Sequence, residues 1–158
     1  MTRGPPGLHT DDLRLALTVL DPWASAIVHG PKNLENRGWR PPAPVLGRLI
    51  WIHASVHYDE AREELAFEHW PEGRAFMEGR VLRGRARPRV TISGLVGVAR
   101  VVGCIDASSS PWFLGPLAWE LVDREALVTP LPVRGGQKLW TVPPEVRALA
   151  LAEVPPLR

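Results

Sequence analysis

The sequence predicts a mixed α+β fold in which about five to six strands form a β-barrel and a few helices pack outside it. Short apolar runs recur along the chain between turns rich in glycine and proline, without regular strand–helix alternation. The 158 residues are 45% hydrophobic and 23% charged, which excludes a disordered chain or a fibrous repeat. We therefore expect one core of ordinary size.

We expect that core to belong to a single domain over residues 13–158. Residues 1–12 are rich in glycine, proline and polar side chains without periodicity, and predict a flexible tail. The chain starts without an apolar signal core and lacks the run of about 18 apolar residues that a membrane span needs. Its one cysteine, Cys104, fits a reducing compartment. These features predict a cytoplasmic protein with no membrane partner and no structural metal.

The first elements lead to a long connector. An apolar run at residues 15–20 predicts a buried strand. Asp21 and the proline after it supply a capping carboxylate and a first helical residue, and Gly30 offers a stop, so residues 23–29 predict a short helix. Residues 31–47 are rich in proline and glycine, and ordered loops of this length are often functional.

The centre of the chain predicts a second strand at residues 48–53 and an amphipathic helix at residues 59–70. Five arginines then fall between residues 80 and 89 with no acidic neighbour. Such a run is either a solvated loop or a surface that follows a phosphate backbone. Further strands are predicted at residues 95–105, 119–122, 131–133 and 139–142, and a closing helix at residues 144–151.

Arginine dominates the positive charge of the chain. There are 19 basic and 17 acidic side chains, and all but two of the basic ones are arginine. The planar guanidinium group binds phosphate through two hydrogen bonds and stacks on bases. This composition permits a nucleic-acid partner, although an arginine-rich proteome would produce the same bias. The sequence lacks the phosphate-binding loop, the dinucleotide fingerprint and the nucleophile elbow of common enzyme classes.

The most informative segment is residues 30–40, within the long connector. It places three cations, one carboxylate and one indole close together: Lys32, Arg37, Arg40, Glu35 and Trp39. Cations of this kind hold an anionic ligand, a carboxylate accepts from a donor, and an indole stacks on a base. The alternative is that Glu35 forms an ion pair that only fixes the loop.

Five segments carry a family resemblance, at residues 17–25, 30–40, 47–55, 111–122 and 130–140. The most specific is a Gly-x-Lys-x-x-Glu-x-Arg pattern, matched by Gly30, Lys32, Glu35 and Arg37. Together they resemble the ASCH (activating signal cointegrator homology) domain over about residues 15–142. The resemblance implies a PUA-like β-barrel whose cleft is lined by this pattern and binds RNA or another nucleic acid.

The first hypothesis is therefore a nucleic-acid-binding domain whose cleft takes RNA or a modified nucleotide. We expect cations to engage phosphate or sugar, the carboxylate to accept from a base edge, and an indole of a loop tryptophan to stack. Three further residues match strand ends and turns that border the same cleft. The expected site residues are Lys32, Glu35, Arg37, Trp39, Arg40, His53, Ser55, Trp112 and Arg134. No cofactor and no metal are expected there.

The second hypothesis is a small hydrolase that acts on a modified nucleoside or on RNA. Some small members of the family are nucleoside amidohydrolases that use the motif lysine, a threonine three residues later and a distant glutamate, and others have been linked to RNA cleavage. Lys32 matches the lysine, whereas Glu35 stands at the threonine position. In this hypothesis Lys32 and Glu35 are the reacting groups.

The third hypothesis is a non-catalytic module that binds a protein partner. In this case Trp112 and Phe113, expected to be exposed in a loop, would anchor the partner as aromatic hot spots do.

Overall fold

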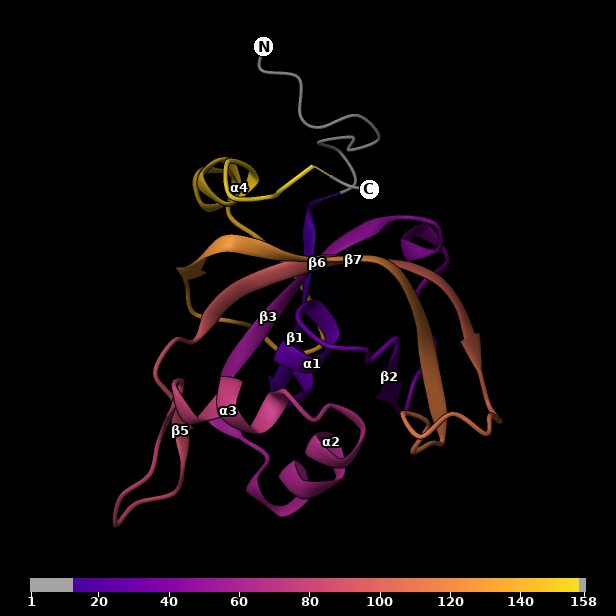
Figure 1. Ribbon diagram of the computed structural model, residues 1–158. Helices are drawn as coiled ribbons and strands as arrows, with labels where there is room; N and C mark the ends of the chain where they lie inside the picture. Colours follow the sequence, from indigo (N-terminus) through magenta and orange to yellow (C-terminus); the bar gives the residue numbers. More distant parts are fainter. Residues whose placement is uncertain (1–12, 157–158) are drawn as a thin grey trace.

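The computed structural model describes residues 13–156, which form a strongly curved mixed sheet with four α-helices around it (Figure 1). The predicted tail at residues 1–12 lies outside the described residues. The strands are β1 (Leu15–Asp21), β2 (Leu34–Arg37), β3 (Leu49–Tyr58), β4 (Val81–Leu82), β5 (Arg89–Val90), β6 (Gly94–Ile105), β7 (Leu117–Pro132) and β8 (Leu139–Thr141). The helices are α1 (Trp23–Val28), α2 (Glu63–His69), α3 (Gly73–Glu78) and α4 (Pro144–Leu151), with short 3₁₀ turns η1 (Ala43–Val45) and η2 (Glu60–Arg62).

The main sheet has the strand order β2-β7-β6-β3-β1-β8. Strands β1 and β3 are parallel, and the other pairs are antiparallel. Two short strands, β4 and β5, form a hairpin that joins the sheet through β3. Within residues 13–156 no pairing connects β2 with β8, so the sheet is open. The predicted mixed α+β fold, with a sheet of about six strands and a few helices, is confirmed, but the sheet does not close into a barrel.

The predicted strands differ from the observed ones in three places, one of which is the short hairpin β4–β5, where the sequence predicted no strand. The segments at residues 119–122 and 131–133 belong to one strand, β7, whose register against β6 shifts three times. Its middle contains Asp123, with φ of 48°, followed by two further charged residues, and this polar stretch hides the strand in the sequence. Strand β2 was missed because its four residues, Leu-Glu-Asn-Arg, carry too little apolar pattern.

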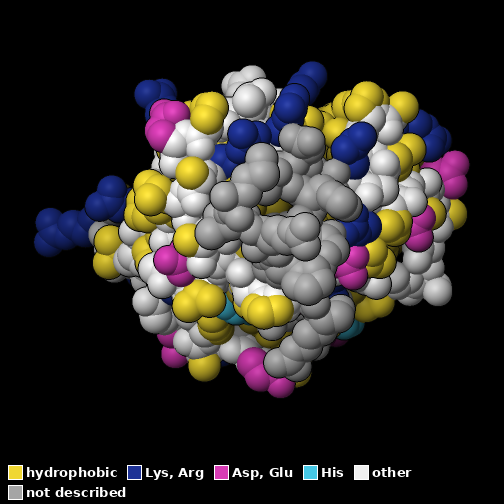
Figure 2. All heavy atoms as spheres, turned by 90° about the horizontal axis from the view of Figure 1, so that it is seen from above, with side chains coloured by type: hydrophobic (Ala, Val, Ile, Leu, Met, Phe, Trp, Pro, Cys, Tyr) yellow, Lys and Arg dark blue, Asp and Glu magenta, His cyan; other side chains and the backbone are white. Residues whose placement is uncertain are grey.

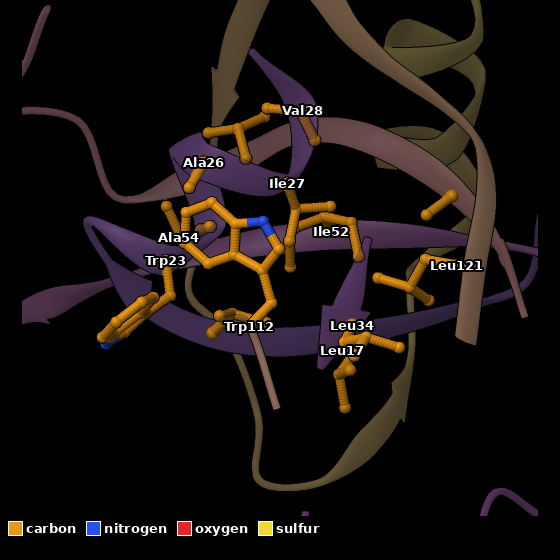
Figure 3. Close-up of a cluster of buried hydrophobic side chains, with 14 of the residues drawn as sticks. Leu17, Trp23, Ala26, Ile27, Val28, Leu34, Ile52, Ala54, Trp112 and Leu121 are labelled. Atoms are coloured by element: carbon orange, nitrogen blue, oxygen red, sulfur yellow. The ribbon is translucent and has the colours of Figure 1, made fainter. Parts of the chain in front are cut away.

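The core lies on both faces of β3. Alternate residues of a strand point to opposite faces, and here Ile50 and Ile52 pack into one apolar cluster, whereas Leu49 and Trp51 pack into the other. The first cluster fills the concave side of the sheet around α1, and Figure 3 shows side chains of α1, β1, β2, β3 and β7 pointing toward one another there. The second cluster includes Ala150 of α4.

Helix α1 is buried along its whole length, and hydrogen bonds hold both of its ends. At its start, Asp21 Oδ1 accepts from the backbone N–H of Ser25 at 2.8 Å, as expected for a capping carboxylate. Beyond its end, Arg124 Nη1 donates to the carbonyls of Ile27, Gly30 and Lys32 at 2.8, 2.9 and 2.9 Å. Strand β7 thus fixes the segment that leads into β2.

The region between β3 and β6 forms a separate cap. The predicted helix at residues 59–70 is divided into η2 and α2, and α3 follows it. Figure 1 places α2 and α3 together on one side of the sheet and α4 on the opposite side. No helix among residues 13–156 combines the length and the apolar character needed to cross a membrane.

Candidate functional site

A pocket of about 500 Å³ lies where β2 approaches β1. The two strands are four places apart in the sheet order, yet Arg37 Nη2 of β2 donates to the backbone carbonyl of Thr18 in β1 at 2.7 Å. The curvature of the sheet therefore brings β2 close to β1 at this point, although the two strands do not pair. The lining residues are Thr18, Val19, Leu20, Trp23, Lys32, Glu35, Asn36, Arg37, Asp59, Ala61, Arg62 and Leu114.

Lys32 lies at the floor of this pocket with 2% of its surface exposed. Its Nζ donates to the carbonyl of Leu34, stands 3.5 Å from Glu35 Oε2 and lies 5.7 Å from the ring centroid of Trp23. Burial lowers the pKa of the Lys32 ammonium group, and the negative charge of Glu35 partly opposes this shift. The floor of the pocket thus holds a cation that has been removed from water.

Glu35 stands between two cations. Its Oε1 is 3.7 Å from Arg37 Nε, and its Oε2 faces Lys32. Glu35 Oε2 and Arg37 Nε are buried and have no hydrogen-bond partner among the described residues. Buried polar atoms are rarely left unpaired in folded proteins. These two atoms are therefore suitable partners for polar groups of a ligand.

The outer wall comes from the cap. Asp59 Oδ2 accepts from Trp23 Nε1 at 2.8 Å, which ties the start of the cap to α1. Arg62 of η2 is exposed and forms no ion pair within residues 13–156. A second hollow of about 480 Å³ shares Arg37 and Arg62 with the pocket and continues past Gly115. The wall thus presents a cation to any ligand that extends out of the pocket.

Two predicted residues of the connector, Trp39 and Arg40, are not among those that line the pocket. Trp39 is half-buried against Trp119, with ring centroids 4.8 Å apart at 88°, and its carbonyl accepts from Trp119 Nε1 at 3.0 Å. Lys138 Nζ lies 6.0 Å from the Trp39 ring centroid. Arg40 is exposed after β2. Both residues follow β2, which lines the pocket, along the sequence.

His53 lies behind the pocket wall. It is 1% exposed, its Nε2 is 2.7 Å from the carbonyl of Val133, and its Nδ1 is 3.4 Å from Thr18 Oγ1. Thr18 lines the pocket, so His53 reaches it only through this hydroxyl. Burial lowers the pKa of His53, and the contact with Val133 opposes the shift. Arg134, next to Val133, is exposed and does not line the pocket.

Ser55 lies farther along β3, where its hydroxyl accepts from the backbone N–H of His57 at 3.1 Å. It is half-buried and is not a lining residue of the pocket.

The expectation that Trp112 is exposed is wrong, because 6% of its surface is accessible. Its ring packs edge to face on Trp23 at 6.4 Å between centroids and on His69 at 5.8 Å. Asn36 of β2 holds this loop in place, since its amide donates to the Trp112 carbonyl at 2.9 Å and accepts from Leu114 N–H at 2.8 Å. The neighbouring proline and glycine suggested a surface loop, but the turn folds back and closes the core. Trp112 therefore offers no ring face to a base or to a protein partner.

The pocket also contains residues that the sequence did not indicate. Thr18 and Leu20 lie in a predicted strand, and their place beside β2 in the pocket follows only from the curvature of the sheet. Asp59 and Arg62 come from the cap, where no motif marked them. Asn36 lies inside the motif and could have been noticed there.

Comparisons with known proteins agree with this fold. The family model of the ASCH domain matches residues 17–113. The crystal structure of ASCH from Zymomonas mobilis superposes with a TM-score of 0.52 and 16% identity, covering 91% of this chain and 97% of that one. A mutant of the same bacterial protein gives a TM-score of 0.52 and 16% identity, covering 94% and 100%. A search of curated proteins finds no match. The chain belongs to the ASCH domain family.

Proposed function

We propose that this protein binds RNA and holds one nucleotide or modified nucleotide in the pocket between β1 and β2. ASCH domains are generally linked to RNA binding, and this pocket is the location that we propose for it in this chain. A volume of about 500 Å³ falls within the usual range of small-ligand sites.

The observation that carries the proposal is the convergence of Lys32, Glu35 and Arg37 on one pocket floor. A buried lysine is costly, and a buried ion pair contributes little net stability compared with apolar residues of the same size. The folded protein therefore gains little from this pair by itself. A ligand that supplies an acceptor to Arg37 Nε and a donor to Glu35 Oε2 would satisfy both unpaired atoms.

Each group then has a role that fits its position. Glu35 accepts from an exocyclic amine or a sugar hydroxyl, and the Lys32 Nζ 3.5 Å away holds that carboxylate in place. Arg37, with 20% of its side chain exposed, and the exposed Arg62 engage phosphate at the mouth. Trp39 contacts the part of the RNA that extends out of the pocket.

The test is the affinity for a single-stranded RNA oligomer, measured by fluorescence anisotropy at several salt concentrations. Replacing one phosphate-contacting arginine should weaken binding about fivefold at about 0.1 M salt and lower the salt slope by about 0.7. We expect this of Arg37→Gln. Arg147→Gln on α4, which is not among the pocket residues, is the matched control and should bind as the wild type does.

The buried pair needs a double variant, because removing one charge leaves the other uncompensated. Lys32→Met with Glu35→Gln removes both charges and should weaken RNA binding in a protein that still melts cooperatively. If this variant and Arg37→Gln both stay folded and bind RNA with wild-type affinity, the pocket is not the binding site.

The lowered pKa of Lys32 favours a second candidate, a hydrolase acting on a modified nucleoside or on RNA. A neutral amine is a competent base, and Glu35, 3.5 Å away, can receive or return the proton. The test is turnover of acylated nucleosides and RNA oligomers between pH 5 and 10. A pH-dependent activity that disappears in the double variant supports the enzyme, and the absence of turnover from the wild type over the whole panel rejects it.

A further inference from the structure

The β4–β5 hairpin is an arm that projects from the cap (Figure 1). Its strands pair through Val81 with Val90 and Leu82 with Arg89, and β5 pairs with β3 through Arg89 and His57. These ladders connect the arm directly to the main sheet.

Side chains reinforce the base of the arm. Arg83 Nη2 donates to Glu63 Oε2 at 2.6 Å, and the guanidinium carbon lies 5.6 Å from the Tyr58 ring centroid. Tyr58 donates its hydroxyl to the same Glu63 oxygen at 2.5 Å. Glu63 directly follows η2, which supplies Arg62 to the pocket wall. The arm and the wall of the pocket are therefore attached to one segment.

The arm carries three exposed arginines, Arg85 and Arg87 in the loop between its strands and Arg89 in β5, which form no ion pair within the described part of the chain. No acidic residue occurs anywhere between positions 79 and 105. Figure 2 shows Lys and Arg side chains projecting beyond the body of the molecule on the side where Figure 1 places the arm. Clustered like charges without counterions repel one another and attract a polyanion.

We propose that this arm contacts the phosphate backbone of the same RNA whose nucleotide occupies the pocket, so that the ligand is a polynucleotide rather than a free nucleoside. The inference rests on the proposed function of the pocket. A free nucleoside has no phosphate chain and gives the three arginines of the arm nothing to bind. A polynucleotide leaving past Arg62 meets positive charge both at the pocket wall and on the arm.

The experiment compares variants for binding a single-stranded RNA of about 20 nucleotides across a salt series. Each phosphate contact contributes about 0.7 to the slope of log affinity against log salt. The triple change Arg85→Ala, Arg87→Ala, Arg89→Ala should lower the slope by about 2 and weaken binding about 100-fold at about 0.1 M salt. The triple change to lysine keeps the charges and is the matched control, expected to remain close to the wild type.

The outcomes separate this inference from the proposed function. If the triple alanine variant keeps wild-type affinity and slope while Arg37→Gln weakens binding, the pocket binds RNA without the arm and the inference is wrong. If the alanine variant weakens binding while Arg37→Gln does not, the arm contacts phosphate independently of the pocket, which also overturns the inference as stated. If the wild type binds no RNA at low salt, the proposed function itself fails.

Discussion

Replacing Arg124 should disturb the segment between α1 and β2, which leads into the pocket. Its Nη1 reaches from β7 to the carbonyls of Ile27, Gly30 and Lys32, all within 2.9 Å. Burial lowers the pKa of this guanidinium group, because removing its charge from water costs free energy. The hydrogen bonds to the three carbonyls offset that cost. Arg124→Met keeps an unbranched side chain, although a shorter one, and removes every donor.

The magnitude follows from the number of carbonyls. A buried acceptor that loses its partner costs about 1–3 kcal/mol. Two effects reduce this cost. Arg124 is half-buried, so water can reach part of the vacated space and hydrogen-bond to the carbonyls. The substitution also removes a partly desolvated charge, which is itself unfavourable in the folded protein. We therefore expect a net loss of about 2–4 kcal/mol, a large part of the roughly 5–15 kcal/mol by which such domains are stable.

Urea unfolding followed by tryptophan fluorescence measures this loss. With a slope of about 2 kcal/mol per M urea, the midpoint should fall by about 1–2 M while the slope stays the same. Arg147→Met on α4 is the control, since no hydrogen bond of the Arg147 side chain is found within residues 13–156, and it should change stability by less than about 0.5 kcal/mol. An Arg124→Met midpoint equal to that of the control would refute the reasoning.

Three further predictions concern the surroundings of the pocket. A Cβ at Gly135 would lie 2.5 Å from His53 Cε1, so Gly135→Ala should cost about 1–3 kcal/mol in thermal unfolding, whereas Gly38→Ala, with open space around it, should cost little. Burial lowers the pKa of His53 in the folded protein below 6.5. As the pH drops from 7 toward 5, the unfolded chain therefore takes up a proton on His53 before the folded protein does, and the free energy of unfolding falls. His53→Gln should reduce that fall, and His57→Gln at an exposed position should not; equal pH profiles for both would contradict this assignment. Asp21→Ala removes the acceptor at the start of α1 and should lower the unfolding free energy by about 1 kcal/mol, while Asp21→Asn keeps an acceptor oxygen and should lose less.

The sequence predicts those parts of the structure that depend on local pattern. The apolar runs locate β1, β3, β6 and β8, and an aspartate and a proline before an apolar stretch locate α1. The motif also brings Lys32, Glu35 and Arg37 to attention, and these residues do meet in space. Glu35 and Arg37 are two residues apart in a strand and so share one face, whereas the contact of Lys32 with Glu35 depends on the irregular backbone that precedes β2.

The remaining features depend on contacts between distant parts of the chain. The pocket exists because the sheet curves until Arg37 reaches Thr18, and no local pattern encodes that closure. Trp112 is buried because Asn36, 76 residues earlier, holds its loop against the core. In both cases the decisive hydrogen bonds join residues far apart in the chain, so proline and glycine near Trp112 gave a misleading indication of exposure.

The proposed RNA site can be located by backbone amide NMR shifts measured during an RNA titration. In a chain of 158 residues the amides can be assigned individually. We expect the largest shifts on the pocket segments, at residues 18–20, 32–37 and 59–62, with smaller ones along the β4–β5 arm. Shifts concentrated on α4 and β8, with the pocket amides unchanged, would contradict the proposed location.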